Sequence, residues 1–216
     1  MKPWILALLA LSLAAHIAWQ LLRGSPSSSS TDLPPAPSAP ALRLASFGES
    51  EAAARLSMLY LQSFEVQTLD YQRLLAWLNA VLELDPRSQY PLFLAARVYA
   101  ENADAARSRM AIQFVHEAFL DDPNRRWPWL AHAALLAKHR LKDLELARRY
   151  AQALERNTTS RDIPLWARQM EIFILEDMNE LEAAKIMLGG LIESGTVTDP
   201  AELRFLRQHL EELEKR

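Results

Sequence analysis

The chain of 216 residues contains no cysteine and only five glycines. The absence of cysteine excludes a disulfide framework, a thiolate zinc site and a cysteine nucleophile. The low glycine content argues against loops that cradle phosphates. Neither the motif GxGxxG nor the motif GxxxxGK followed by Ser or Thr occurs. A net charge of -3 argues against a nucleic-acid partner, since neutralising phosphates requires a basic surface.

Charged side chains are also absent from a long stretch near the N-terminus. Residues 4–22 form an apolar stretch of 19 residues without a formal charge. At about 1.5 Å per residue, a helix of this length just spans a hydrocarbon core of about 30 Å. Trp4 and Trp19 lie near its two ends, where indole rings favour the headgroup level. We therefore predict a transmembrane signal anchor over residues 1–23 that contacts the lipid bilayer through residues 4–22.

A cleaved signal peptide is the alternative for the same segment. Ser12, Leu13 and Ala14 offer small residues at the two positions that a signal peptidase reads. The apolar sequence continues beyond them, which favours the retained anchor. Lys2 precedes the stretch and Arg23 follows it, so the positive-inside rule favours a cytoplasmic N-terminus. The prediction is a single-pass inner-membrane protein with a periplasmic domain.

The next segment is rich in serine and proline. Residues 24–46 contain seven Ser and five Pro and almost no aliphatic run. Such a composition cannot bury a hydrophobic core, so we predict a disordered linker that tethers a domain covering residues 47–216.

The domain repeats with a period of 37 residues. Pro86 and Pro123 are separated by this interval, as are Pro91 and Pro128. A series of large apolar residues has the same spacing, namely Leu92, Trp129, Trp166 and Leu203. A fixed period between about 20 and 50 residues is typical of stacked repeats, in which each unit is too small to bury its own apolar face.

Helix signals occupy each period. Asp199 and Pro200 combine an N-cap with a proline at the first helical position, and every proline of the domain is expected at a helix boundary or in a first turn. We predict helices over residues 50–65, 69–84, 89–102, 105–121, 126–140, 143–156, 163–177, 180–194 and 200–214. The fold class is therefore all-α, a solenoid of about four helical hairpins whose last helix acts as a cap with a polar outer face.

Several strings resemble the tetratricopeptide repeat family. The sequence from Leu82 to Pro86, Leu-Glu-Leu-Asp-Pro, is similar to the end of such a repeat. The spacing of Leu92, Ala96 and Tyr99 is similar to the family's large, small and aromatic positions, although this period is longer than the family's period of about 34. The resemblance is specific for fold and not for function.

The resemblance also implies a partner-binding groove lined by the first helix of each unit. The residues that match groove positions are Tyr90, Phe93, Arg97, Trp127, Leu130, Ala134, Ala167, Glu171 and Ile174. Trp129 and Trp166 fall at core positions of the same helices, whereas both a groove and a core position remain open for Trp127. Exposed aromatic and arginine side chains in such a groove are typical binding anchors.

Charge is unevenly distributed along the repeats. Residues 125–168 contain 10 Lys or Arg against 4 Asp or Glu, while the flanking stretches are acidic. This third hairpin could recognise an acidic peptide or a lipid headgroup, or it could pair with its acidic neighbours. The candidate patch consists of Arg125, Arg126, Lys138, Arg140, Lys142, Arg148 and Arg149.

Residues with catalytic or metal-binding chemistry form no recognisable pattern. His132 and His139 lie seven residues apart, about 10 Å along a helix, too far for one metal ion without other ligands. We expect no metal, no cofactor and no enzymatic activity. The predicted function is a membrane-tethered scaffold or adaptor that binds protein partners in the cell envelope. The alternative is a protein that binds an anionic glycan or a lipid headgroup through the basic third hairpin.

Overall fold

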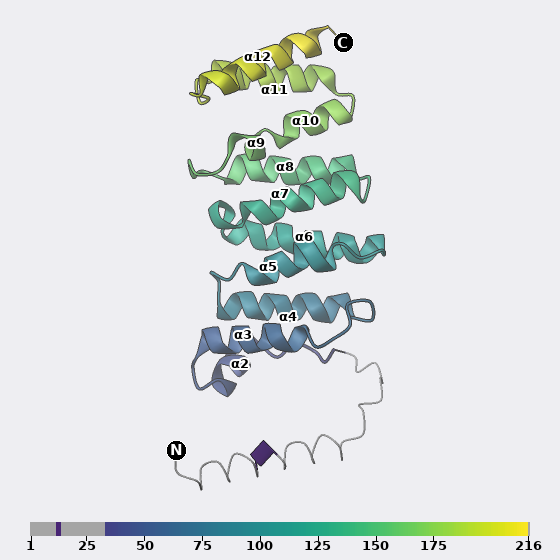
Figure 1. The fold of residues 1–216 in the computed structure, drawn as a ribbon, viewed down its shortest axis with the longest axis vertical. Coiled ribbons are helices and arrows are strands. Elements are labelled where there is room, and N and C mark those ends of the chain that lie inside the picture. The colour runs from purple at the N-terminus through teal and green to yellow at the C-terminus, as the bar shows by residue number, and fades with distance from the viewer. Residues whose placement is uncertain (1–11, 14–32, 216) are drawn as a thin grey trace. The chain divides into compact units, whose positions relative to one another are not determined.

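The computed structural model describes residues 12–13 and 33–215, and it divides the chain into two compact units, residues 1–33 and 34–216. Within the described residues all regular secondary structure is helical, and none of it is a strand. The prediction of an all-α fold is therefore confirmed. In the second unit the helices follow one another in chain order (Figure 1).

Most helices of the second unit pack against the helices that precede and follow them in sequence. Residues Tyr90–Tyr99 are α-helical up to Leu94 and π-helical from Ala95 onward, and the π-helical part is labelled η1. The elements are α2 (Ala39–Ala45), α3 (Ser50–Leu61), α4 (Tyr71–Leu84), α5 (Tyr90–Leu94), η1 (Ala95–Tyr99), α6 (Ala105–Asp121), α7 (Pro123–His139), α8 (Leu144–Asn157), α9 (Leu165–Arg168), α10 (Met170–Asp177), α11 (Leu181–Glu193) and α12 (Pro200–Glu214).

An aspartate is the N-cap residue of four of the longer helices, α4, α6, α8 and α12. The side chain of Asp70 accepts the N–H groups of Gln72 and Arg73, Asp104 makes the equivalent two bonds at α6, and Asp143 accepts one N–H, that of Leu146, at α8. Asp199 accepts the N–H of Ala201 at 2.9 Å, with Pro200 as the first residue of α12, which confirms the predicted start. Each carboxylate satisfies backbone donors that have no partner within the helix.

One proline prediction is wrong. Pro128 lies inside α7, because this helix begins at Pro123 rather than near residue 126. Proline at this position removes one backbone donor from the helix. The side chain of Asn124, the residue four positions earlier, accepts the N–H groups of Thr159 and Ser160 at 2.8 and 2.9 Å. This first turn is therefore fixed by the following loop rather than only by helical hydrogen bonds.

The boundary of the predicted linker also differs from the structure. Residues 34–46 belong to the second unit and contain α2. Ser38 caps this helix and Pro40 stands in its first turn, so two residues that indicated a linker are here residues of a helix start. The indole of Trp77 donates to the carbonyl of Pro34 at 2.9 Å and attaches the segment to α4. Residues 24–32 lie outside the described residues.

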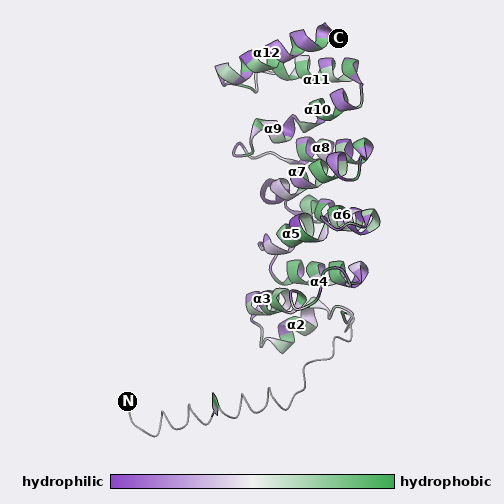
Figure 2. Ribbon diagram, turned by 45° about the vertical axis from the view of Figure 1, so that its right-hand side comes forward, coloured by the Kyte–Doolittle hydropathy of each residue, from purple (hydrophilic) through white to green (hydrophobic). Residues whose placement is uncertain are grey.

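Hydrophobic and hydrophilic residues alternate around the helices (Figure 2), and many of the hydrophobic ones are buried. Leu78 of α4, Leu92 of α5 and Phe119 of α6 are fully buried. The last helices have a core of their own, made of Ile172, Leu175, Ala184, Leu188, Val197, Leu206 and Leu213. The buried residues thus form a series of interfaces along the chain.

Of the predicted membrane-spanning residues 4–22, the structure describes only Ser12 and Leu13. Among the helices of the described part, none combines the length and the apolar character needed to cross a bilayer.

Candidate functional site

A row of aromatic rings crosses from α5 to α7. Tyr90 and Phe93 are 41% and 39% exposed, and their rings stack with centroids 6.1 Å apart. The ring of Phe93 then meets the edge of Trp129 on α7 at 5.8 Å. The indole of Trp129 donates to the side-chain oxygen of Gln89 at 2.7 Å, which fixes the orientation of this partly buried ring. The row, Tyr90, Phe93 and Trp129, is an apolar surface held by a rigid scaffold.

Arg97 and His132 extend the aromatic row. Arg97 lies in η1 and is exposed, and its guanidinium nitrogen is 3.5 Å from Nδ1 of His132. A guanidinium can only donate, so Nδ1 accepts and the neutral ring carries its hydrogen on Nε2. Burial of the ring, and then the positive charge of Arg97, lower the pKa of His132 below its ordinary value. The imidazole is therefore neutral at pH 7.

The position of Arg97 depends on an irregular turn. The N–H of Ala100 bonds to the carbonyl of Ala95 at 2.8 Å, a spacing of five residues that defines a π-turn. Such a turn contains one more residue than an α-helical turn and frequently occurs at functional sites. The phenol of Tyr71 donates to the carbonyl of Tyr99 at 2.9 Å, so this backbone acceptor at the end of η1 has a partner.

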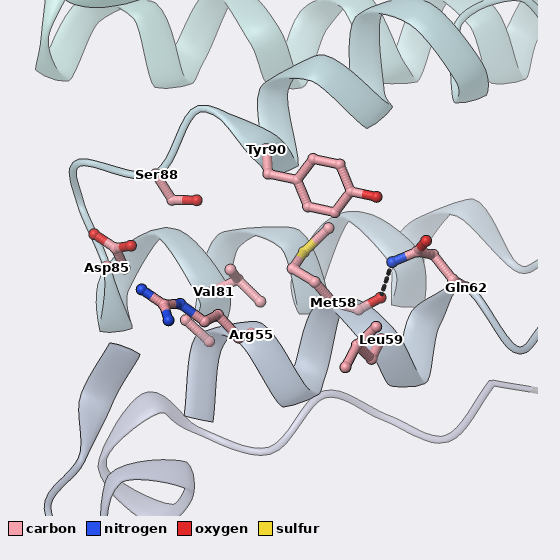
Figure 3. Close-up of a pocket in the computed structure, with 9 residues that line it drawn as sticks. Arg55, Met58, Leu59, Gln62, Val81, Asp85, Ser88 and Tyr90 are labelled. Atoms are coloured by element: carbon pink, nitrogen blue, oxygen red, sulfur yellow. Dashed lines mark hydrogen bonds between the residues drawn. The ribbon is translucent and has the colours of Figure 1, made fainter. Parts of the chain in front are cut away.

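A cavity of about 530 Å³ adjoins the row on the side of α3 and α4. Met58 and Leu59 of α3 and Val81 of α4 supply apolar walls, and Tyr90 from the start of α5 faces them (Figure 3). Polar groups stand around them, contributed by Arg55, Gln62, Asp85 and Ser88. Tyr90 belongs both to the cavity and to the aromatic row, so the two features form one continuous candidate site.

Sequence reasoning missed the α3 side of this site. The predicted groove residues begin at Tyr90, so they include none of α3. The pattern of α3 does predict an amphipathic helix, with Met58 buried and Leu59 exposed on neighbouring faces. It does not predict which of these faces the next hairpin leaves open.

Only part of the predicted groove is accessible. Tyr90, Phe93 and Arg97 are exposed, whereas Leu130 and Ala134 of α7 are fully buried and Ala167 and Ile174 are nearly so. The last four side chains therefore pack inside the domain and do not line a groove. Phe93 and Leu130 are 37 residues apart, so equivalent positions of the period differ in burial between α5 and α7.

Glu171 is also buried rather than available to a partner. Its carboxylate accepts from Gln152 at 2.6 Å and from Arg148 at 3.2 Å, both on α8. Burial, followed by the charge of Glu171, raises the pKa of the neighbouring Glu155. This polar cluster joins α8 to α10, so its evident effect is structural.

The two tryptophans that were expected in the core, Trp129 and Trp166, are not fully buried. Trp129 is partly buried within the aromatic row, and Trp166 is 50% exposed. Trp166 instead meets the ring of Trp127 edge to face, with centroids 5.7 Å apart. Trp127 is itself partly buried, so it belongs to neither a fully open groove nor the deep core. This pair joins α7 to α9 and is an aromatic contact separate from the row on α5 and α7.

Most residues of the predicted basic patch are paired with neighbours. Arg126 is only 3% exposed and donates to the carbonyls of Ala118 and Pro86. Arg140 donates to the carbonyl of Glu101 at 2.8 Å. The remaining ion pairs are Arg125 with Asp122, Lys138 with Asp177, and Arg148 with Glu171 and Glu180. Within the described residues only Lys142 and Arg149 of the seven make no ion pair or hydrogen bond.

A smaller cavity of about 250 Å³ lies between α6 and α8. It includes Arg149 and the side chain of Arg109, which already pairs with Asp143 at 2.7 Å. His116 stacks on Tyr150 with centroids 5.0 Å apart, and burial raises the pKa of this tyrosine to about 12. Glu117 offsets the remaining positive charge, so this cavity has little preference for an anion.

No group of three or more His, Asp or Glu side chains within residues 12–13 and 33–215 is arranged to hold a metal ion. No protein-family model matches the chain, and neither a curated protein nor a solved structure is significantly similar to it. The candidate site is thus defined by its own geometry, an exposed aromatic row that continues into an apolar cavity.

Proposed function

We propose that this chain is a membrane-tethered adaptor that holds a protein partner in the cell envelope on the face formed by α3, α5 and α7. The observation that carries the proposal is the row of the exposed Tyr90 and Phe93 and the partly buried Trp129, next to a cavity with apolar walls and a polar surround. Aromatic side chains on a rigid surface lose little entropy on binding and dominate the energy of many interfaces. A helix or an extended peptide could bury its apolar residues there.

We also propose that the second unit is a helical-repeat solenoid of the tetratricopeptide type. Helices α8 and α11 begin at Leu144 and Leu181, which are 37 residues apart. Polar contacts connect residues at nearly the same interval. Asn124 binds Thr159 across 35 residues, and Glu176 binds His209 across 33. In such an architecture each unit contacts only its neighbours and the first helices present an extended surface.

The location of the domain follows from the predicted anchor. Residues 4–22 would hold the chain in the bilayer, and the positive-inside rule would export the domain. A tethered adaptor has a high effective concentration toward partners in or near the same membrane. The anionic-ligand alternative is less well supported, because five of the seven basic side chains already have partners within the domain.

A photo-crosslinking amino acid placed at Phe93 in the full-length chain tests the proposal in intact membranes. The matched control places it at Leu120 of α6, which is also exposed. We expect a specific protein adduct from position 93 and none from position 120. Binding of the identified partner should weaken by at least about tenfold in a Tyr90→Ala/Phe93→Ala variant. Equal adducts at both positions, or unchanged affinity in this variant, would contradict the proposal.

A further inference from the structure

The end of α2 and the turn after it expose two large apolar side chains. Leu44, near the end of α2, is 81% exposed, and Phe47, just after it, is 97% exposed. They stand three residues apart, and the N–H of Phe47 donates to the carbonyl of Leu44 at 3.1 Å. Both side chains therefore belong to one hydrogen-bonded turn. No other large apolar side chain among the described residues is more exposed than these two.

The backbone of Phe47 is unusual for its residue type. Its φ of 55° lies in the left-handed region, which disfavours side chains with a Cβ and suits glycine or asparagine. The following N–H, of Gly48, closes the turn on the carbonyl of Arg43 at 2.8 Å. Because the ring is almost completely exposed, no packing within the domain offsets this strain. The backbone of Phe47 therefore ends α2 in a Schellman turn, whereas its exposed ring has no packing partner in the domain, and this is a reason to look for a binding role of the ring.

The two ends of the helical series differ in their exposed residues. The last helix, α12, exposes mainly charged and polar side chains, among them Arg204, Arg207, Gln208, Glu211 and Glu212, beside Phe205, which is 52% exposed. The first helix, α2, exposes Ala41, Leu44 and Ala45 beside a single arginine. In the sequence, α2 is also the helix of the second unit that lies nearest to the predicted anchor. The apolar turn is thus at the tethered end.

The short tether would keep this turn within reach of the bilayer that the predicted anchor spans. Residues 23–33 separate the predicted span from the second unit. Even a fully extended chain of this length reaches only about 40 Å, at about 3.6 Å per residue. Contact between the turn and the membrane would be an intramolecular event, so a small apolar contact is sufficient for it.

The size of the apolar turn favours a lipid surface over a protein. A standard protein interface buries about 800 Å² on each partner and is built around a packed centre. Two side chains on one exposed turn provide much less than this. An interfacial membrane contact needs no complementary pocket, because the side chains enter the boundary between headgroups and acyl chains.

We propose that Leu44 and Phe47 insert into the interface of the bilayer that the predicted anchor spans, and so hold the α2 end of the domain against the membrane. This contact is separate from the aromatic row on α5 and α7. It requires the predicted anchor, but it does not require any protein partner.

The absence of cysteine makes a direct test possible. The full-length chain is reconstituted into vesicles of phosphatidylcholine with a minority of phosphatidylglycerol, and a nitroxide label is attached through Leu44→Cys or Phe47→Cys. Ile186→Cys on α11, at a site that is 75% exposed, is the matched control. We expect the labels at 44 and 47 to collide mainly with oxygen dissolved in the lipid, and the label at 186 mainly with an aqueous nickel chelate. Equal nickel accessibility at all three positions would overturn the proposal.

A second variant separates membrane contact from folding. Phe47→Gly removes the ring and relieves the left-handed strain. We expect it to leave thermal stability unchanged or raised, while the label at position 44 becomes several-fold more accessible to nickel. Lower stability would mean that the ring supports the fold, which overturns the proposal, as would unchanged accessibility at position 44. If the full-length chain does not float with the vesicles, the membrane-contact proposal is also overturned. The crosslinking experiment at Phe93 then decides partner binding independently.

Discussion

The hairpin of α7 and α8 and the hairpin of α9, α10 and α11 occupy equivalent positions in the 37-residue period, yet they are built differently. α7 is one continuous helix of 17 residues, whereas its counterpart is interrupted at Gln169. α8 buries Leu146, Ala147, Tyr150, Ala151 and Leu154, whereas α11 buries only Ala184 and Leu188. Equal spacing of helices therefore does not produce equal packing.

The polar contacts of the two hairpins differ in the same direction. The buried Arg126 of α7 donates to the backbone carbonyl of Ala118 in α6 and to that of Pro86 in the turn after α4. The last hairpin is joined to α12 by partly buried side-chain pairs, Gln169 with Glu202 and Glu176 with His209. Helix α11 also contains Gly189 and Gly190, which lower helix stability. We infer that the last hairpin opens more easily than the hairpin of α7 and α8.

The largest expected effect is that of Arg126→Ala. The substitution leaves the carbonyls of Pro86 and Ala118 without their charged donor in a buried site. We expect a loss of roughly 3 kcal/mol in the free energy of unfolding, measured by urea titration. Arg125→Ala is the matched control, because its exposed ion pair with Asp122 contributes at most about 1 kcal/mol. Similar losses in both variants would mean that Arg126 is not a structural centre of α7.

Leucine truncation tests the packing difference directly. Leu154 of α8 is fully buried, and Leu191 of α11, its equivalent 37 residues later, is only partly buried. We expect Leu154→Ala to lower the free energy of unfolding by about 3 kcal/mol, and Leu191→Ala by about 1 kcal/mol. Hydrogen exchange should show faster opening near α11 in the second variant without a change at α8. If both variants lose the same stability, the last hairpin is packed as firmly as its counterpart.

The positions of the helices were predictable from the sequence, because local signals determine them. Asp199 and Pro200 fix the start of α12, and the 37-residue period relates the starts of α8 and α11. Ser38 and Pro40 carry the same kind of signal at α2. There the serine-rich composition of the surrounding segment favoured a linker instead.

The burial of individual side chains was less predictable. Leu92, Trp129 and Trp166 are equivalent in the period, but the first is fully buried, the second partly buried and the third half exposed. The period determines where a helix begins, whereas its rotation depends on the helices on both sides. The π-turn after Leu94 and the interruption at Gln169 change this rotation locally. Of the predicted groove residues, Tyr90 and Phe93 are therefore exposed, whereas Leu130 and Ile174 are buried.

Helix capping offers a smaller test of the same comparison. Asp143 caps α8 by accepting the N–H of Leu146, whereas its equivalent at α11, Glu180, makes no such bond. We expect Asp143→Ala to cost about 1 kcal/mol and Glu180→Ala about half as much or less. The hydrogen bond from Leu146, and then Arg109, lower the pKa of Asp143. This stabilisation is present above the ordinary pKa of 3.8 and is lost as the pH falls through the lowered value. Urea titrations in acid should show a flatter pH dependence in Asp143→Ala.

Filling the glycine position of α11 should strengthen the weaker hairpin. A Cβ at Gly190 would meet no atom within 4 Å apart from its chain neighbours and the backbone of its own helix, so alanine there is expected to raise the free energy of unfolding by about 0.5 kcal/mol. Gly195→Ala is the opposite control, because its φ of 66° disfavours alanine and the variant should lose stability. Thermal unfolding of both variants measures the two signs. A loss of stability in Gly190→Ala would show that this helix face is covered in solution.

The smallest expected effect is a pH dependence confined to the more firmly packed region. Burial is the main cause that lowers the pKa of His116 and His132 below the ordinary value of 6.5. Because the unfolded chain takes up protons more readily than these buried rings, their contribution to stability is complete above this pH and is lost as the pH falls below it. Hydrogen exchange at about pH 7 and about pH 5 should show weaker protection of α6 and α7 in acid. In His116→Gln/His132→Gln this difference should shrink, and an equal decline in the double variant would assign the acid sensitivity to other groups.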